Sequence, residues 1–171
     1  QARRIDEPDP VAAATLAEVV GLRVEVLEVG MAGALRARAM PPERAGAPAS
    51  VAAAELPSAA LGLVEDDAVL DRVEAWTTVP IDRARLRDRL AELQLAPWAD
   101  LDGEGALLRA AALRSSVERL VDATEADVGG PAPDLVVLAG GAWSAVPAPA
   151  ALLIVADAVR RSRAGLSDPR R

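Results

Sequence analysis

The sequence predicts an α/β protein built on a mixed sheet, with a β-hairpin near the N-terminus and helices flanking the sheet. The hairpin is predicted because charged and apolar residues alternate through Leu22–Val29 and again through Ala34–Met40. A third strand is predicted at Leu135–Ala139, where five apolar residues lie between a Gly-Gly-Pro segment and a glycine pair. Between these strands, residues 66–124 carry the spacing of amphipathic helices.

The N-terminal part of the chain is expected to contain a helix before the hairpin and a strand after it. Asp9 and Pro10 are typical of the start of a helix, here Val11–Val20, which ends at a glycine. A proline- and glycine-rich loop follows the hairpin, and a further short strand is predicted at Val51–Leu56.

The connection inside the hairpin is short and contains two glycines, Gly30 and Gly33. Glycine is favoured where a turn needs positive φ, so we expect both residues to adopt it. Backbone N–H groups in such a turn can hold phosphate, although an ordinary hairpin has the same pattern.

The middle of the chain is predicted to be helical and charged. Apolar residues three and four positions apart indicate helices at Asp66–Ala75, Asp82–Leu95 and Glu104–Thr124, the last one capped by Asp102. Four arginines alternate through the second helix, and acidic residues lie among them. This pattern indicates an exposed, salt-bridged surface, or alternatively a surface that binds a protein partner.

The last strand, Leu135–Ala139, is apolar enough to be covered on both faces, so we expect it to be a parallel strand in the centre of the sheet. A glycine pair, Gly140 and Gly141, follows it, and a proline-opened helix is predicted from Pro147 to Arg161. We expect the pair to need permissive φ and to bring backbone close to the hairpin, because ligands of such sheets bind beyond the carboxyl ends of the strands.

Composition excludes several kinds of chemistry. The chain of 171 residues has no His and no Cys, so a Ser-His or Cys-His pair, a zinc site with nitrogen or sulfur ligands and a disulfide framework are all excluded. Its net charge of -7 argues against nucleic acid as a partner, and the apolar runs are too short for membrane insertion. The abundance of Ala, Arg, Gly and Pro is typical of a GC-rich bacterium. We expect a piece of a larger cytoplasmic protein.

Each candidate site residue also has a structural interpretation. Gly140 and Gly141 either contact a nucleotide or only turn the chain from strand to helix. Trp143 follows directly and either anchors the core or forms the wall of a ligand pocket.

In the order of these features the chain resembles the second lobe of actin/Hsp70-like ATPases, and it is most similar to the glutamate mutase L proteins of that superfamily. The segment Leu27–Ala34 takes the place of the family's phosphate hairpin. Asp134–Arg161 matches the family's late apolar strand, which ends in Gly-Gly before a proline-containing helix near the adenosine. The resemblance implies a ribonuclease H-like fold and a nucleotide-binding lobe.

The chain departs from the family pattern at the hairpin. Glu28 stands where the family has Asp, and Gly33, Ala34 and Leu35 replace the small hydroxyl residues that hold phosphate. The family's first lobe is absent, so we expect no ATPase activity from this chain alone and name no catalytic residue and no metal ligand. We expect binding of ATP and magnesium only in a longer parent protein. The cofactor-binding residues that the resemblance implies are Glu28, Gly30, Gly33, Gly140, Gly141 and Trp143.

The resulting hypothesis is a degenerate nucleotide-binding lobe that acts as an accessory or chaperone-like factor with a protein partner. The alternative is a non-catalytic interaction or scaffold domain with a pseudo-ATPase fold; an unrelated small-molecule transferase is a third interpretation. We expect a flexible segment at residues 1–10, the lobe at 11–161 with a helical insert at about 58–102, and a loose tail at 162–171.

Overall fold

The structure is a computed structural model, and it describes residues 10–44, 46–57, 66–96 and 102–166. Parts of the predicted insert, at 58–65 and 97–101, lie outside the described residues. So do residues 1–9, with the predicted helix cap at Asp9, and residues 167–171 of the predicted tail.

The described residues form an α/β fold around a four-stranded mixed sheet, as predicted. The strands are β1 (Val24–Val29), β2 (Ala34–Met40), β3 (Ser50–Leu56) and β4 (Leu135–Ala139), and they lie in the order β3-β2-β1-β4. β1 and β2 form the predicted antiparallel hairpin, and β3 pairs antiparallel with β2. β4 pairs with β1 in parallel.

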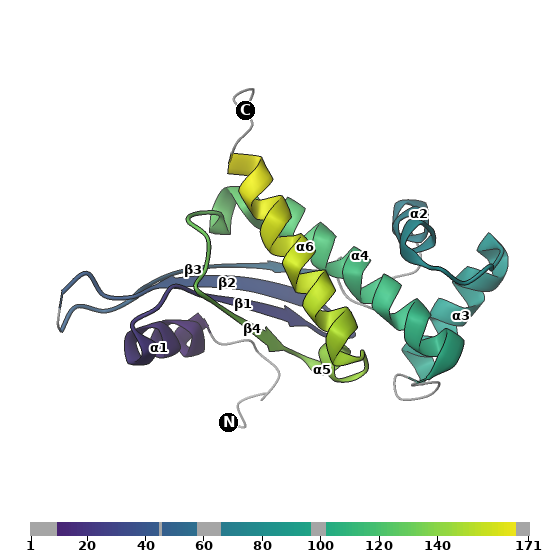
Figure 1. Cartoon of the computed structure of the whole chain (residues 1–171), viewed down its shortest axis with the longest axis horizontal. Helices are drawn as coiled ribbons and strands as arrows, with labels where there is room; N and C mark the ends of the chain where they lie inside the picture. The colour runs from purple at the N-terminus through teal and green to yellow at the C-terminus, as the bar shows by residue number, and fades with distance from the viewer. Residues whose placement is uncertain (1–9, 45, 58–65, 97–101, 167–171) are drawn as a thin grey trace.

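Helices cover the two faces of this sheet unequally (Figure 1). α4 and α6 lie on one face and α1 lies on the other, while α2 and α3 pack beside α4, away from the sheet. The helices are α1 (Pro10–Val20), α2 (Asp67–Trp76), α3 (Arg83–Leu95), α4 (Gly103–Val128), α5 (Gly141–Ser144) and α6 (Ala148–Leu166).

Most element boundaries agree with the sequence prediction to within one residue, and three elements differ by more. β1 begins at Val24 and not at Leu22, because Gly21 ends α1 with a φ of 68° and the chain needs the next residues to turn into the sheet. α4 and α6 continue beyond their predicted ends, to Val128 and Leu166. After Gly105, no glycine or proline occurs in α4 before Gly129, so nothing in its sequence forces an earlier end.

Aspartates cap α2 and α3, whereas the predicted capping bond at the start of α4 is not formed. The Asp66 side chain accepts a hydrogen bond from the backbone N–H of Ala68 at the start of α2, and Asp82 does the same for α3. Asp102 occupies the cap position of α4, but its side chain makes no capping bond, which corrects the prediction. Gly103, the first residue of α4, has a φ of 52°, and the Ala106 N–H donates to the Asp102 carbonyl at 3.2 Å in the first turn.

The predicted central position of Leu135–Ala139 is wrong, because within the described residues β4 is an edge strand paired only with β1. All five of its residues are half-buried, so it is not fully covered on either face. An apolar run indicates that a strand is buried, but it does not indicate which strands lie beside it. The neighbour of β4 is β1, which is separated from it by more than 100 residues of chain.

The position of β4 is fixed by a reciprocal set of hydrogen bonds at its start. The Asp134 carboxylate accepts from the Arg23 backbone N–H at 3.1 Å, from Nε at 2.8 Å and from Nη2 at 2.6 Å. In return the backbone N–H groups of Asp134 and Leu135 donate to the Arg23 carbonyl. These bonds set the parallel register of β1 and β4 before the first strand residue.

The main core lies between the sheet and α4, α5 and α6. Leu27 and Val29 of β1 point to this side and pack against Leu113, Val117 and Leu120 of α4. Burying each such aliphatic side chain stabilises the fold by roughly 1.5 to 3 kcal/mol. A smaller cluster on the other face joins α1 to Val24 and to alternate residues of β2.

Candidate functional site

The glycine pair after β4 lies directly against β1. Gly140 adopts φ 90° and ψ 154°, a region that is almost restricted to glycine. A Cβ atom on Gly140 would lie 2.4 Å from the Val29 carbonyl oxygen and 2.8 Å from its carbon. The turn therefore contacts the end of the hairpin through backbone, as predicted, and it does so because Gly140 has no side chain.

The need for glycine is confined to the first residue of the pair. Gly141 is the first residue of α5, and it is not among the described glycines with positive φ. The prediction that Gly141 needs permissive φ is therefore wrong. A paired glycine does not reveal which of its members carries the turn, because either can supply the positive φ.

The hairpin turn also differs from the prediction. The Gly30 N–H donates to the Gly33 carbonyl at 2.9 Å and closes the turn. Neither glycine has positive φ, so the turn is not one of the glycine-dependent hairpin types that the sequence suggested. A Cβ on Gly33 would make only ordinary contact with Pro57, at 3.7 Å.

Glu28 lies near the end of β1, beside Leu35 of β2 and Ala139 of β4. Its side chain is half-buried and makes no ion pair or hydrogen bond with another described residue. Burial raises the pKa of the Glu28 carboxyl above its ordinary value. Such a carboxylate can accept hydrogen bonds from a cation or from metal-bound water.

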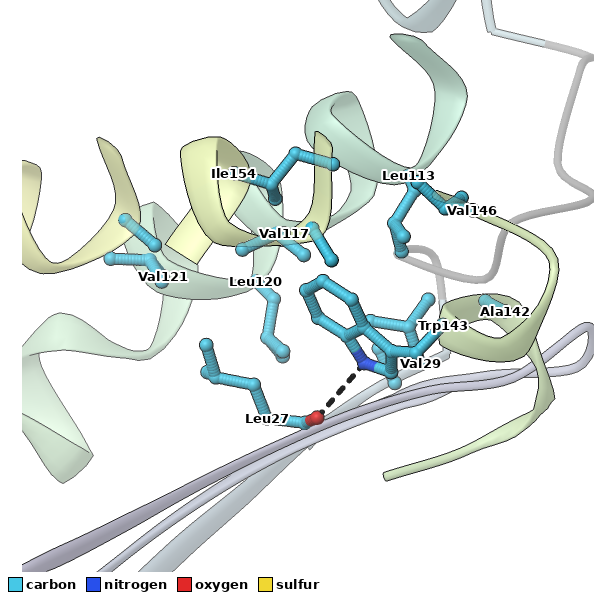
Figure 2. Packing of buried hydrophobic residues seen from close by; sticks show 13 residues of the cluster. Leu27, Val29, Leu113, Val117, Leu120, Val121, Ala142, Trp143, Val146 and Ile154 are labelled. Atoms are coloured by element: carbon cyan, nitrogen blue, oxygen red, sulfur yellow. Dashed lines mark hydrogen bonds between the residues drawn. The ribbon is translucent and has the colours of Figure 1, made fainter. Parts of the chain in front are cut away.

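Trp143 is part of the core (Figure 2). Its side chain is 8% exposed, and its ring lies among Val117, Leu120 and Ile154. The indole Nε1–H donates to the Leu27 carbonyl at 3.1 Å, so the buried polar group is satisfied. The structure thus supports the core interpretation of Trp143, and its role as the wall of a ligand pocket stays a prediction.

The predicted site residues are therefore brought to one end of the sheet but not into one chemical centre. Gly140 contacts the hairpin at Val29, and Trp143 bonds to Leu27 on the α4 side of β1. Glu28 lies between Leu27 and Val29 in β1, so its side chain points to the opposite face of the sheet, the side of α1.

A buried ionic network lies on the α4 side of the sheet, and the sequence analysis did not foresee it. Glu25 accepts hydrogen bonds from Arg36 Nε at 2.6 Å and from Arg38 Nη2 at 2.8 Å, and all three side chains are buried. Arg36 also bonds to Glu125 of α4 at 2.8 Å. Charged residues at alternate positions of a strand normally indicate a solvent-exposed face. The sequence pattern therefore did not predict that these charged side chains are buried.

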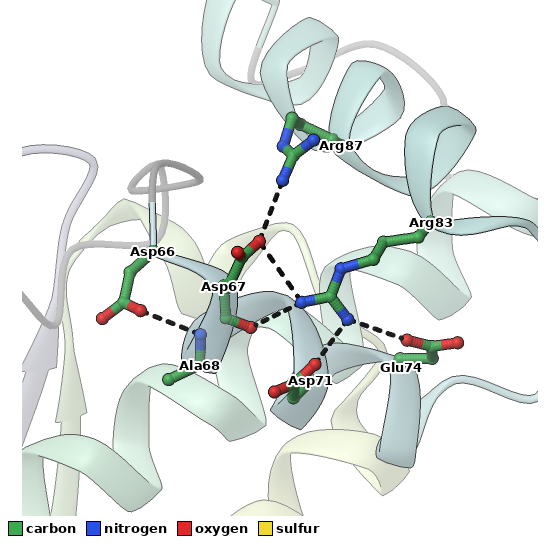
Figure 3. Close-up of polar contacts among 7 residues, drawn as sticks. All are labelled: Asp66, Asp67, Ala68, Asp71, Glu74, Arg83 and Arg87. Atoms are coloured by element: carbon green, nitrogen blue, oxygen red, sulfur yellow. Dashed lines mark hydrogen bonds and ion pairs between the residues drawn. The ribbon is translucent and has the colours of Figure 1, made fainter.

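The predicted salt-bridged surface is present between α2 and α3 (Figure 3). Arg83 pairs with Asp71 and, at 3.3 Å, with Asp67, and Arg87 pairs with Asp67 at 3.0 Å. These contacts are exposed, so each one contributes little to stability.

Among the described residues, no group of three or more acidic side chains is placed to hold a metal ion. No helix in the described part of the chain is long and apolar enough to cross a membrane. Comparison of the chain with protein-family models, with curated proteins and with solved structures gives no match.

Proposed function

We propose that this chain is a degenerate nucleotide-binding lobe of an actin/Hsp70-like protein, with a ribonuclease H-like fold, similar to glutamate mutase L proteins. In that role it serves in the cytoplasm as an accessory or chaperone-like factor for a protein partner, such as a coenzyme B12-dependent mutase. The observation that carries the proposal is the contact of Gly140 backbone with Val29, because it joins the late glycine turn to the hairpin. The resemblance requires these two segments to flank one ligand.

The pairing of the strands supports the same proposal. The hairpin is antiparallel, helices follow it, and the late strand returns to pair in parallel with β1. The edge position of β4 removes one feature that we expected of such a lobe. The proposal therefore depends on the contact between the two turns and not on the order of the strands.

The residues at the hairpin explain why the site is proposed to be degenerate. The side chain of Glu28 is one methylene longer than the aspartate it replaces, which displaces the carboxylate from the position where it would orient metal-bound water. Ala34 and Leu35 have no hydroxyl group to donate to phosphate. Only backbone N–H groups remain as donors, and weak binding without hydrolysis follows.

Titration of the whole chain with MgATP, followed by NMR, tests this proposal. We expect no ATP hydrolysis and a dissociation constant of about 1 mM or weaker, which corresponds to roughly -4 kcal/mol. The amide signals that move should belong to the hairpin turn and to Gly140. A micromolar dissociation constant would contradict the degeneracy, and shifts confined to α2 and α3 would contradict the location of the site.

The alternative, a protein-interaction or scaffold domain, is favoured by one specific observation. Leu152 and Leu153 on α6 are 69% and 67% exposed, which is unusual for adjacent leucines. By contrast, the arginines of α3 that we considered for this role are paired with acidic residues, Arg83 and Arg87 with α2 and Arg85 and Arg89 with Glu104 of α4. If the parent protein does not bind ATP, and if Leu153→Glu removes capture of a partner without lowering the melting temperature, this alternative replaces the first proposal.

A further inference from the structure

One side of β4 pairs with no strand in the described part of the chain. An edge strand offers unpaired N–H and C=O groups to another chain, and proteins usually protect such an edge with charges, proline or a bulge. β4 contains no charged residue and no proline, and its register with β1 is unbroken. The opposite edge strand, β3, carries Glu55. The edge of the sheet that favours pairing with a further strand is therefore that of β4.

The hydrogen bonds to β1 determine which backbone groups of β4 point outward. The Leu135 N–H donates to the Arg23 carbonyl at 3.1 Å, so the backbone groups of Leu135 point to β1. In a parallel pair, the N–H and C=O of one residue point to the same side, and successive residues alternate. The groups of Val137 therefore also point to β1. Val136 and Leu138 each direct one donor and one acceptor away from the sheet.

α6 presents an apolar stripe on the side that is turned away from α4. Asp157 marks the side that faces α4, because its carboxylate pairs with Arg114. With about 100° of rotation per residue, Leu152, Val155 and Val159 lie on the far side of the helix from Asp157. Leu152 is 69% exposed, and the two valines are half-buried. We name this stripe, formed by Leu152, Val155 and Val159, the α6 flank; its spacing is typical of a helix that packs against another helix.

The open edge of β4 and the α6 flank lie on the same side of the molecule. α4 packs against β3, β2 and β1, and α6 packs beside α4. The core residues of α6 cluster with Val136 and Leu138 of β4, so α6 lies at the β4 side of the helical layer (Figure 1). A partner that adds a strand beside β4 therefore brings its own helical layer to the α6 flank.

We propose that two copies of this chain associate through β4, which pairs antiparallel with its copy about a two-fold axis at Val137. In this register Val136 lies opposite Leu138 of the second copy, and Val137 lies opposite Val137. Opposite residues of an antiparallel pair alternate between exchanging two hydrogen bonds and exchanging none. The outward groups of Val136 and Leu138 are thereby all paired, and Val137, whose groups point to β1, takes the position without hydrogen bonds.

The same axis brings the two helical layers together. It is perpendicular to the sheet, so both copies of α6 lie on one face, and their flanks are turned toward each other. Neither β4 nor the α6 flank carries a charge, so the copies meet no like charges there, although each chain has a net charge of -7. A single strand of another protein would pair with the edge but leave the α6 flank exposed, whereas a second copy supplies both elements by symmetry.

The inference stands independently of the proposed function, because it requires only the strand edge and the α6 flank. Analytical ultracentrifugation of the whole chain over a range of concentrations tests it. We expect a species with twice the mass of the chain and a dissociation constant in the micromolar range, as for a small interface.

Two matched variants separate the α6 flank from the rest of the helix surface. Leu152→Glu places a like charge from each copy near the axis and should weaken association by about tenfold or more. Leu153→Glu adds the same charge at a neighbouring side chain that is 67% exposed, but on the Asp157 side of the helix. It should weaken association by less than about twofold, because salt screens distant charges. Circular dichroism melts verify that both variants fold.

Hydrogen exchange of the backbone amides locates the interface in the sheet. The amides of Val136 and Leu138 should become more protected as the protein concentration rises. The amide of Val137, which points to β1, should be protected at low concentration as well. The protection of Val136 and Leu138 should be lost in the Leu152→Glu variant at concentrations where the original chain is paired.

Three results would overturn the proposal. The first is a chain that stays monomeric at every concentration, which would leave the edge of β4 to a strand of another protein. The second is an equal effect of Leu152→Glu and Leu153→Glu on association. The third is protection that rises with concentration in β3 and not in β4, because this would assign the contact to the opposite edge of the sheet.

Discussion

Replacing Gly140 with alanine adds one methyl group at the point where two segments of backbone are in contact. The structure gives two separate costs. The conformation, with φ 90° and ψ 154°, is strained for any residue with a Cβ, at about 1 to 3 kcal/mol. The added Cβ would also lie 2.4 Å from the Val29 carbonyl oxygen, and displacing a well-packed core in this way costs a further 1 to 3 kcal/mol or so.

Together these costs are a large part of the stability of a single domain, which is typically about 5 to 15 kcal/mol. For a chain of this length we expect the melting temperature of Gly140→Ala to fall on the order of 10 °C. Thermal unfolding followed by far-UV circular dichroism measures this fall, and urea unfolding measures the change in free energy.

Two other glycines serve as matched controls. Gly46 has a φ of 82° but no atom within 4 Å of its added Cβ, so Gly46→Ala carries the backbone cost without the contact with Val29. Gly141 has a helical backbone, and Gly141→Ala should change stability by less than about 0.5 kcal/mol. If Gly140→Ala is no more destabilising than Gly46→Ala, the contact with Val29 has no energetic role. If it is no more destabilising than Gly141→Ala, the argument from conformation fails as well.

Three further predictions concern the contacts that hold the sheet and the core. Hydrogen bonds from Arg23, which directly precedes β1, lower the pKa of Asp134 from 3.8 to about 2. The Asp134→Asn variant should therefore be less stable than the original chain at neutral pH. Because the folded-state pKa is depressed, this difference should persist above pH 3.8 and disappear as the pH falls toward 2, which acid-dependent melts would reveal. Trp143→Phe removes the indole hydrogen bond to the Leu27 carbonyl and should cost about 0.5 to 1.5 kcal/mol in urea unfolding, the net contribution of one intramolecular hydrogen bond. Arg36→Met leaves the buried carboxylate of Glu25 with one partner fewer and should cost about 3 to 5 kcal/mol, and a loss below 1 kcal/mol would show that the network is not buried in solution.

The sequence by itself determined the secondary structure well. Ala34–Met40 and Leu135–Ala139 were predicted with the boundaries that the structure shows. Asp66 and Asp82 were predicted to begin helices, and both cap them. These features depend on residues that are close in the chain. Alternation of side chains along a strand and a capping carboxylate before a helix can therefore be seen without knowledge of the fold.

Whether the charged residues of the hairpin are buried or exposed depended on the tertiary structure. Arg36 and Arg38 alternate with alanine, as in a strand with one solvated face, yet both are buried because α4 packs over them and Glu25 neutralises them. The sequence shows the alternation but not which face the longest helix covers.

The candidate site was predicted in outline, since the glycine turn does meet the hairpin, but its details required the structure. Which glycine is essential depends on the approach of Val29, which is distant in the sequence from Gly140. Strand order likewise follows from pairing between distant segments, so the apolar run Leu135–Ala139 indicated a strand but not its place at the edge. Local pattern specifies which segments are strands and helices, whereas their neighbours, and thus the surfaces left open for a partner, are decided by packing of the whole chain.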